Sequence, residues 1–229
     1  MLPLQNPVPK AFLFDLNGTL INDMEFHIQA WHTLLNNELG ATLNWAEVKR
    51  EMYGKNSELL VRVFGAGHFS DAEMEQWSVE KERRYQQEFA PHLKTIDGLD
   101  AFLKTAADAG IRMAIGSAAI PMNVDFVLDG LHLRPYFDAV VTAADVTHSK
   151  PNPETFVKAA RQLHIAPADC VVFEDAPKGV EAALNAGMKA VVLTTMHGEE
   201  AFARYPNIVA FVRDYTDPVL QQLFLQIPV

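Results

Sequence analysis

The sequence predicts an α/β protein with a doubly wound parallel sheet and an inserted α-helical cap domain. Six short apolar runs lack the alternation of a half-exposed strand, which is typical of strands buried on both faces of a parallel sheet. From about residue 99 onward, helical stretches separate most of these runs, as expected for repeated strand–helix units. The predicted strands cover residues 11–14, 111–115, 139–141, 170–173, 190–193 and 208–211.

The helical stretches between the strands have recognisable ends. Glycine directly follows three of them, and glycine is a common stop because it adopts the left-handed conformation without a steric penalty. Helices are expected over residues 99–109, 122–129, 154–163 and 179–186.

The segment between about residues 23 and 92 contains no strand-like run, and its apolar residues recur at helical spacing. We therefore expect a Rossmann-like catalytic core formed by residues 1–21 and 95–229, with a helical cap formed by residues 22–94. An insertion directly after the first strand would overhang the sheet edge at which this class of fold binds ligands.

Composition limits the function classes. The chain has 229 residues, of which 49% are hydrophobic, enough for one core and a small second module. Its net charge of −10, without a run of Lys or Arg, argues against nucleic acid and anionic membranes as partners. The single cysteine, Cys170, lies in an apolar run and is expected to be buried, which fits a reducing cytoplasm. No apolar stretch is long enough to span a bilayer.

Polar side chains follow several of the predicted strands. Asp15 follows the first strand, Ser117 the second, and Glu174 and Asp175 the strand that ends at residue 173. Lys150 lies in a polar segment after the strand at 139–141. Because ligands bind at the carboxyl ends of strands in an open parallel sheet, we expect these groups to meet at one edge.

These residues supply what phosphoryl transfer requires: a nucleophile, oxygen ligands for a metal, and donors for the phosphoryl oxygens. Asp15 is the candidate nucleophile, and together with Asp175 and Glu174 it forms an oxygen cluster suited to Mg²⁺. The phosphoryl oxygens would be bound by Lys150, Ser117 and the backbone of Gly18 and Thr19.

The pattern resembles four motifs of the haloacid dehalogenase superfamily. The stretch from Asp15 to Thr19 resembles the first motif, Asp-x-Asp-Gly-Thr; Ser117 resembles the second, Lys150 the third and Glu174-Asp175 the fourth. Their order and spacing agree over essentially the whole chain. The helical insertion resembles the cap of the β-phosphoglucomutase-like branch, which carries a stretch similar to Phe26-His27-x-x-Ala30-Trp31.

The resemblance implies that Asp15 attacks phosphorus and becomes an aspartyl phosphate. Mg²⁺ would be held by Asp15, Asp175 and the main-chain carbonyl of Asn17, with Glu174 bound directly or through water. Ser117, Lys150 and Thr19 would steady the phosphoryl group, and the substrate-binding positions are Gly18, His27, Lys55 and Ala118. The resemblance implies a Mg²⁺-dependent phosphatase of a small phosphorylated metabolite, and we expect this protein to be cytoplasmic and monomeric.

The sequence departs from the first motif at Asn17, where the superfamily normally has an acid–base aspartate. An amide cannot donate and retake a proton near pH 7, and general acid–base catalysis is typically worth about 10²–10⁴ in rate. Three explanations stay open. In the first, Asn17 is natural in a slow enzyme or in one that acts on good leaving groups. In the second, it is a substitution engineered to trap a complex. In the third, the chain is a catalytically impaired protein that binds phosphorylated ligands.

A β-phosphoglucomutase-like phosphotransferase is an alternative to the hydrolase. It is less favoured because the stretch Ala118-Ala119-Ile120-Pro121 after Ser117 is apolar. The resemblance to that enzyme would place polar residues there to hold a second phosphate.

Three features of the predicted cap allow more than one interpretation. His27 would either bond to the acid–base position and couple cap closure to proton transfer, or be a half-buried histidine. Lys55, between two cap helices, would either contact a leaving group or be a surface lysine. Lys81, Arg83 and Arg84 would form either a basic patch on a cap helix or a solvated helix face, and the solvated face is favoured.

Overall fold

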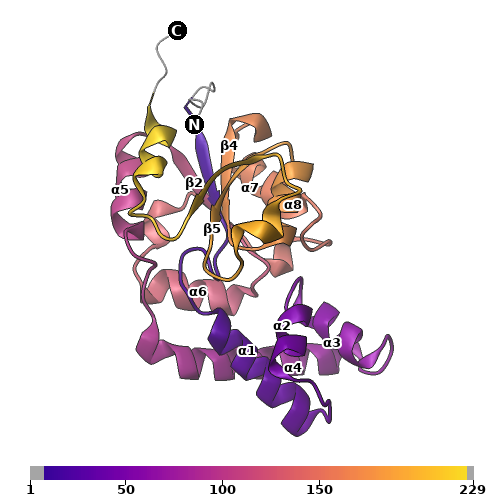
Figure 1. Ribbon diagram of the computed structural model, residues 1–229. Helices are drawn as coiled ribbons and strands as arrows, with labels where there is room; N and C mark the ends of the chain where they lie inside the picture. Colours follow the sequence, from indigo (N-terminus) through magenta and orange to yellow (C-terminus); the bar gives the residue numbers. More distant parts are fainter. Residues whose placement is uncertain (1–7, 226–229) are drawn as a thin grey trace. The chain divides into compact units, whose positions relative to one another are not determined.

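The computed structural model describes residues 8–225 and divides the chain into two compact units (Figure 1). The first unit consists of Met1–Asn22 and Lys94–Val229, and the second of Asp23–Leu93. The boundaries expected from the sequence differ from these by one residue.

The first unit is built on a parallel sheet, with the strand order β3-β2-β1-β4-β5-β6 among the described residues. Central β1 pairs on one side with β2 and on the other with β4. The strand order reverses at β1, and such a switch point is where ligands bind in open α/β sheets. The strands are β1 (Ala11–Phe14), β2 (Arg112–Gly116), β3 (Ala139–Val141), β4 (Cys170–Glu174), β5 (Lys189–Leu193) and β6 (Ile208–Val212). The predicted doubly wound, Rossmann-like α/β fold is confirmed.

Helices cover both faces of this sheet. Figure 1 shows α5 on the opposite side of the sheet from α7 and α8. The helices of the first unit are α5 (Leu99–Asp108), α6 (Pro121–Gly130), α7 (Glu154–Gln162) and α8 (Pro177–Asn185). All four residues of β1 are buried, which explains why the strand reads as a continuous apolar run rather than an alternating one.

The two faces of β1 contribute to different parts of the core. Leu13 packs with Phe156 of α7 and Val180 of α8 on one side. On the other, Phe14 stacks on Phe173 with ring centroids 4.7 Å apart, and Phe12 stacks on Phe102 of α5. Each fully buried aromatic side chain stabilises the fold by about 1.5–3 kcal/mol, so this cluster fixes the strands that carry the polar residues. Cys170 is buried, as predicted.

The second unit is helical among the described residues. Its helices are α1 (Met24–Thr33), α2 (Trp45–Glu51), α3 (Asn56–Phe64) and α4 (Asp71–Phe89). Asn44 and Ser70 begin α2 and α4 with reciprocal capping bonds to Glu47 and Glu73. The helices enclose a core that includes Ile28, Trp31, Leu35, Val48, Leu59 and Leu60.

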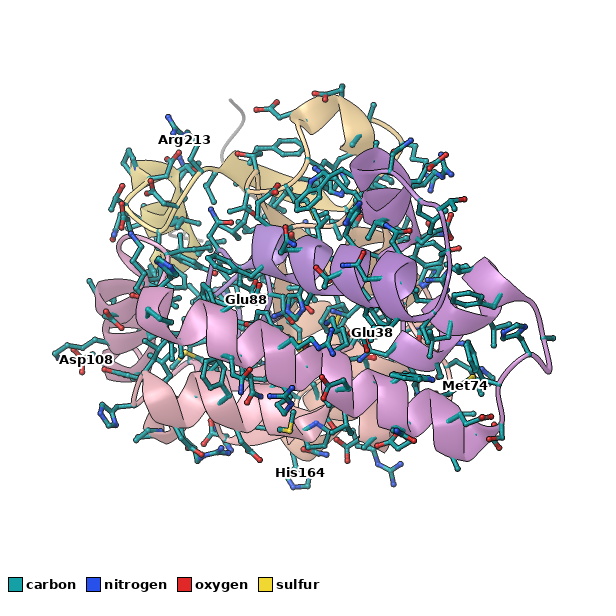
Figure 2. All side chains as sticks on the ribbon, turned by 90° about the horizontal axis from the view of Figure 1, so that it is seen from below. Glu38, Met74, Glu88, Asp108, His164 and Arg213 are labelled. Carbon is teal, nitrogen blue, oxygen red and sulfur yellow. The ribbon has the colours of Figure 1, made fainter. Side chains whose placement is uncertain are left out.

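Several charged side chains of the second unit lie on its outer surface, for example Glu88 on α4 (Figure 2). Over the part of the chain that the structure describes, none of the helices combines the length and apolar content needed to cross a bilayer.

Candidate active site

Asp15 begins the loop that follows β1. Its N–H donates to the carbonyl of Phe173 at the end of β4, so the residue continues the pairing of the two central strands. Its side chain is buried, with 8% of the residue exposed, and accepts a hydrogen bond of 2.6 Å from the ammonium group of Lys150. A loop 135 residues away along the chain therefore meets the carboxyl end of the central strand, as the sequence predicts.

Glu174 connects Lys150 to the turn after β4. One carboxylate oxygen accepts from the Lys150 ammonium at 2.8 Å. The other accepts from the N–H groups of Asp175 and Ala176, each at 2.9 Å. A Cβ at Gly179 would overlap this carboxylate, so the first turn of α8 needs glycine there. Glu174 thus holds both the lysine and the turn that carries Asp175.

The charges of this cluster are unequal. The ammonium of Lys150 bonds to the buried carboxyl groups of Asp15 and Glu174, and the carboxyl group of Asp175 is buried in the adjacent turn, which makes three potential negative charges and one positive. Burial raises the pKa of Asp15 to about 7; Lys150 opposes this shift and Glu174 adds to it. Burial by itself lowers the pKa of Lys150, but the charges of Asp15 and Glu174 outweigh it and raise that pKa.

Gly18 and Thr19 continue the loop after Asp15. Gly18 has a φ of +73°, and a Cβ there would overlap the carboxylate of Asp175. That carboxylate therefore packs directly against the loop of Asp15. The hydroxyl of Thr19 is buried and has no hydrogen-bond partner among the residues that the structure describes. A buried hydroxyl without a partner is costly, which is consistent with a polar group of a ligand binding beside it.

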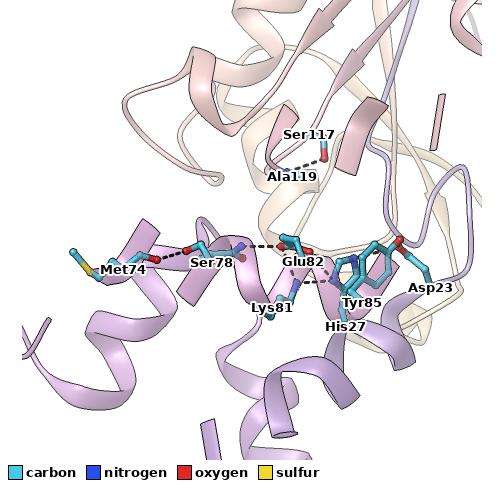
Figure 3. A network of polar contacts seen from close by, with 10 residues as sticks. Asp23, His27, Met74, Ser78, Lys81, Glu82, Tyr85, Ser117 and Ala119 are labelled. Atoms are coloured by element: carbon cyan, nitrogen blue, oxygen red, sulfur yellow. Dashed lines mark hydrogen bonds and ion pairs between the residues drawn. The ribbon is translucent and has the colours of Figure 1, made fainter. Parts of the chain in front are cut away.

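Ser117 follows β2, the other neighbour of β1. Its N–H donates to the carbonyl of Val141 at 3.0 Å, and its hydroxyl accepts from the N–H of Ala119 at 3.1 Å (Figure 3). Ala118 lies half-buried within this short turn. The turn places a hydroxyl at the carboxyl end of β2.

The donor set of this edge fits a hard divalent cation. Carboxylate and main-chain carbonyl oxygens are the ligands that Mg²⁺ prefers, and the cluster carries excess negative charge. Within residues 8–225, however, no group of three or more His, Cys, Asp or Glu side chains is arranged as a ready metal site. Lys150 and the turn amides engage the oxygens of Glu174. A ligand role for Asp15, Asn17, Glu174 and Asp175 stays a prediction.

The two candidate residues of the helical unit have different surroundings. Lys55 precedes α3, and its main-chain N–H donates to Glu58 at 3.0 Å. His27 on α1 is buried, and its ring stacks on Tyr85 of α4 with centroids 3.7 Å apart. Substrate-binding roles for Lys55 and His27 stay predictions.

His27 belongs to a buried polar network within the helical unit (Figure 3). Its Nδ1 lies 2.7 Å from the Nζ of Lys81, and its Nε2 lies 3.2 Å from a carboxylate oxygen of Asp23. With Lys81 charged, Nδ1 accepts and the ring proton is assigned to Nε2, where it faces Asp23. The hydroxyl of Tyr85 donates to the same oxygen of Asp23 at 2.5 Å.

The network corrects the interpretation of Lys81 as part of a solvated helix face. Lys81 is 2% exposed and donates to Glu82 at 2.8 Å, and Glu82 also accepts from the amide of Asn56 at 2.7 Å. The carboxylate of Glu82 on the same helix and the imidazole of His27 on α1 take the place of water around the lysine. Arg83 and Arg84 do lie toward the surface, where both bind Glu80.

The sequence did not predict a role for three residues that bond to the loops of Asp15 and Lys150. Glu154 at the start of α7 accepts from the N–H groups of Thr147 and His148, which fixes the loop that leads to Lys150. Thr195 and Tyr215, after β5 and β6, donate to the loop of Asp15. The rule that identified Ser117, a polar residue after a predicted strand, would also have selected Thr195.

The fold and this edge define an enzyme of the phosphatase or phosphotransferase class. The sequence model of the haloacid dehalogenase-like hydrolase family matches residues 12–193, and the chain belongs to this family. Within it, the chain falls in the β-phosphoglucomutase-like branch.

Individual relatives agree with this assignment. Fructose-1-phosphate phosphatase YqaB of Escherichia coli (strain K12) is 32% identical, over 79% of this chain and 94% of that protein. β-Phosphoglucomutase of Bacillus subtilis (strain 168) is 29% identical, over 80% of this chain and 82% of that protein. A crystal structure of β-phosphoglucomutase from Clostridium difficile superimposes with a TM-score of 0.81 at 23% identity, covering 94% of this chain and 97% of the other, and so shares the fold.

Proposed function

We propose that this protein hydrolyses a small phosphorylated metabolite, of the sugar phosphate type, through a phosphoryl intermediate on Asp15. The observation that carries the proposal is the buried carboxylate of Asp15 at the switch point of the sheet, bonded to Lys150. The similarity to a fructose-1-phosphate phosphatase and to β-phosphoglucomutases supports a sugar phosphate as the substrate class.

In the first step, a carboxylate oxygen of Asp15 forms a bond to phosphorus while the bond from phosphorus to the ester oxygen breaks, and the ester oxygen takes a proton from water and leaves as the alcohol. Lys150, Ser117 and the Thr19 hydroxyl supply donors for the phosphoryl oxygens, which carry most of the charge in such transition states. In the second step, a water oxygen bonds to the same phosphorus and releases the Asp15 carboxylate. Inorganic phosphate is the product.

A magnesium ion would be held by Asp15, Asp175 and the carbonyl of Asn17, and would neutralise charge on the phosphoryl group. The excess of buried carboxyl groups over ammonium groups supports a divalent cation there. Glu174 would contribute directly or through water while it holds Lys150.

Asn17 limits which leaving groups depart readily. An ester alkoxide needs a proton as it leaves, and the amide of Asn17 cannot supply one. An acyl phosphate or an anhydride leaves with little protonation, so these substrates are less affected. The chain is therefore expected to turn over sugar phosphates slowly and acyl phosphates faster.

A screen of phosphate release tests this function. Sugar phosphates and acetyl phosphate are compared for the protein, for its Asn17→Asp variant and for its Asp15→Asn variant, each with and without Mg²⁺. Asn17→Asp is expected to raise turnover of sugar phosphates by about 10²-fold or more, the usual worth of general acid–base catalysis. Asp15→Asn is expected to abolish turnover. Equal sugar phosphatase activity in the unmodified protein and its Asn17→Asp variant would contradict the proton-transfer explanation.

A second function, binding of a phosphorylated ligand without turnover, is favoured by the same amide at position 17. Mass spectrometry after incubation with acetyl phosphate and Mg²⁺ separates the two functions. An adduct of one phosphoryl group on Asp15 indicates a slow enzyme. Binding of a sugar phosphate with neither adduct nor turnover indicates a binding protein.

A further inference from the structure

Two hydroxyl groups hold consecutive main-chain carbonyls of the loop that carries Asp15. Thr195, two residues after β5, donates from Oγ1 to the carbonyl of Gly18 at 2.6 Å. Tyr215, three residues after β6, donates to the carbonyl of Thr19 at 3.1 Å. Neither β5 nor β6 pairs with β1, so the outer half of the sheet reaches back to the central loop.

The same two peptide groups are also bound at their N–H ends. The N–H groups of Thr19 and Leu20 both point to the carbonyl of Leu16, at 3.3 and 2.8 Å. The peptide group between Gly18 and Thr19 and the one between Thr19 and Leu20 are therefore fixed at both ends. Because a trans peptide is planar, bonding at both ends removes its freedom to rotate.

The hydroxyl of Tyr215 is itself held in place. Its residue is 5% exposed, and its ring packs against Phe102 and Phe173 with centroids 5.3 and 5.9 Å apart. Burial raises the pKa of Tyr215 well above its usual range, and the negative charges of Asp15 and Asp175 add to the shift. The hydroxyl therefore stays a donor throughout the neutral range.

We propose that Thr195 and Tyr215 are positioning residues for phosphoryl transfer, which hold the loop from Gly18 to Leu20 so that the Thr19 hydroxyl faces the reacting group. The proposal rests on the proposed function. Both residues act through the main chain and do not touch the reacting atoms. Small displacements of groups that contact a transition state are costly, so loss of either hydroxyl is expected to affect the chemical step more than substrate binding.

The test uses the full chain and replaces one hydroxyl at a time. Tyr215→Phe keeps the packed ring, and Thr195→Val keeps the branched shape. Thr194→Val is a matched control, since the Thr194 hydroxyl donates to the carbonyl of Val212 in β6, away from the loop. Tyr205→Phe is a second control, because its hydroxyl bonds to Glu181.

We expect Tyr215→Phe and Thr195→Val each to lower kcat for acetyl phosphate about 10-fold or more, with KM changed less than about 3-fold. Thr195→Ser should restore kcat to within about 2-fold of the original, because it returns the donor. The two controls should match the unmodified protein. If both hydroxyl-deleted variants keep the kcat of their controls, the proposal is wrong.

Amide hydrogen exchange provides a readout that does not depend on turnover. In the hydroxyl-deleted variants the amides of Thr19 and Leu20 should exchange about 10-fold faster, with the amides of β1 unchanged. If the unmodified protein has no phosphatase activity, the exchange result still decides whether the two hydroxyls order the loop. Unchanged exchange at both amides would overturn the ordering role even in an active enzyme.

Discussion

The ammonium group of Lys150 lies 2.6 Å from the carboxylate of Asp15, and both residues are about nine-tenths buried. Charge pairs of this kind are costly to assemble, but removing one partner is costlier because the other is left buried without compensation. Here the lysine also donates a hydrogen bond to Glu174, so its loss would leave the buried carboxyl groups of Asp15 and Glu174 without their shared ammonium group.

Lys150→Met should therefore destabilise the first unit by about 3–5 kcal/mol when a chelator removes divalent ions. Urea unfolding with and without the chelator measures this change in stability. In a separate assay, the phosphatase activity of the variant should fall below the detection limit. Lys104→Met is the control, since Lys104 pairs with Asp108 at the surface and its loss should cost less than about 1 kcal/mol. Equal stability of the two variants would show that the buried pair is not needed for folding.

Glu154 stabilises the loop of Lys150 in a manner that depends on pH. Lys158 and the N–H groups of His148 and Thr147 lower the pKa of Glu154 from 4.5 to about 2. A carboxyl group with a depressed pKa stabilises the folded state above its unfolded pKa. That contribution is lost as pH falls from about 4.5 toward 2.

We expect Glu154→Gln to be less stable than the unmodified protein at pH 7 and to approach it in stability near pH 3. Urea midpoints at both pH values measure this difference. Glu75→Gln, on the exposed face of α4, should show little difference at either pH. If the difference in urea midpoint between Glu154→Gln and the unmodified protein stays constant down to pH 3, the effect comes from packing rather than from charge.

The parts of the site that the sequence predicted share one physical origin. Strands buried on both faces produce apolar runs that are visible in the sequence, and the polar residue after each run lies at the same edge of a parallel sheet. Asp15, Lys150 and Glu174 could therefore be expected to meet, and hydrogen bonds of 2.6 and 2.8 Å join them.

The parts that were missed depend on contacts between segments that no local pattern connects. Lys81 is buried beside His27 on another helix, 54 residues earlier, with its Nζ 2.7 Å from the Nδ1 of the ring. Tyr215 reaches Thr19 across 196 residues, and its role follows from the position of a hydroxyl rather than from a motif. Residue type alone assigns a lysine to the surface, and it places a tyrosine between the surface and the core.

Within the helical unit, Tyr85 is expected to stabilise the packing of α1 against α4. Its hydroxyl donates to Asp23 at 2.5 Å, and the same carboxylate oxygen lies 3.2 Å from His27. Tyr85→Phe removes one hydrogen-bond donor from the buried carboxylate of Asp23, which should lower the free energy of unfolding by about 1–3 kcal/mol. Urea unfolding measures the loss, and faster hydrogen exchange confined to α1 and α4 would locate it. Tyr136→Phe, at a partly exposed position of the first unit, should change neither.

Gly18 offers the sharpest test of how closely the loop of Asp15 packs against Asp175. Gly18 and Gly110 both have a φ of +73°, but a Cβ at Gly18 would overlap the Asp175 carboxylate, whereas nothing lies within 4 Å of a Cβ at Gly110. Gly110→Ala therefore reports the cost of the backbone conformation alone, roughly 1 kcal/mol. Gly18→Ala should cost clearly more, because it also displaces a buried carboxylate, and it should lower phosphatase activity by at least about 10²-fold. Unfolding curves and turnover of both variants measure the two effects. If Gly18→Ala behaves like Gly110→Ala in stability and in turnover, the carboxylate of Asp175 does not pack against the loop as closely as the structure shows.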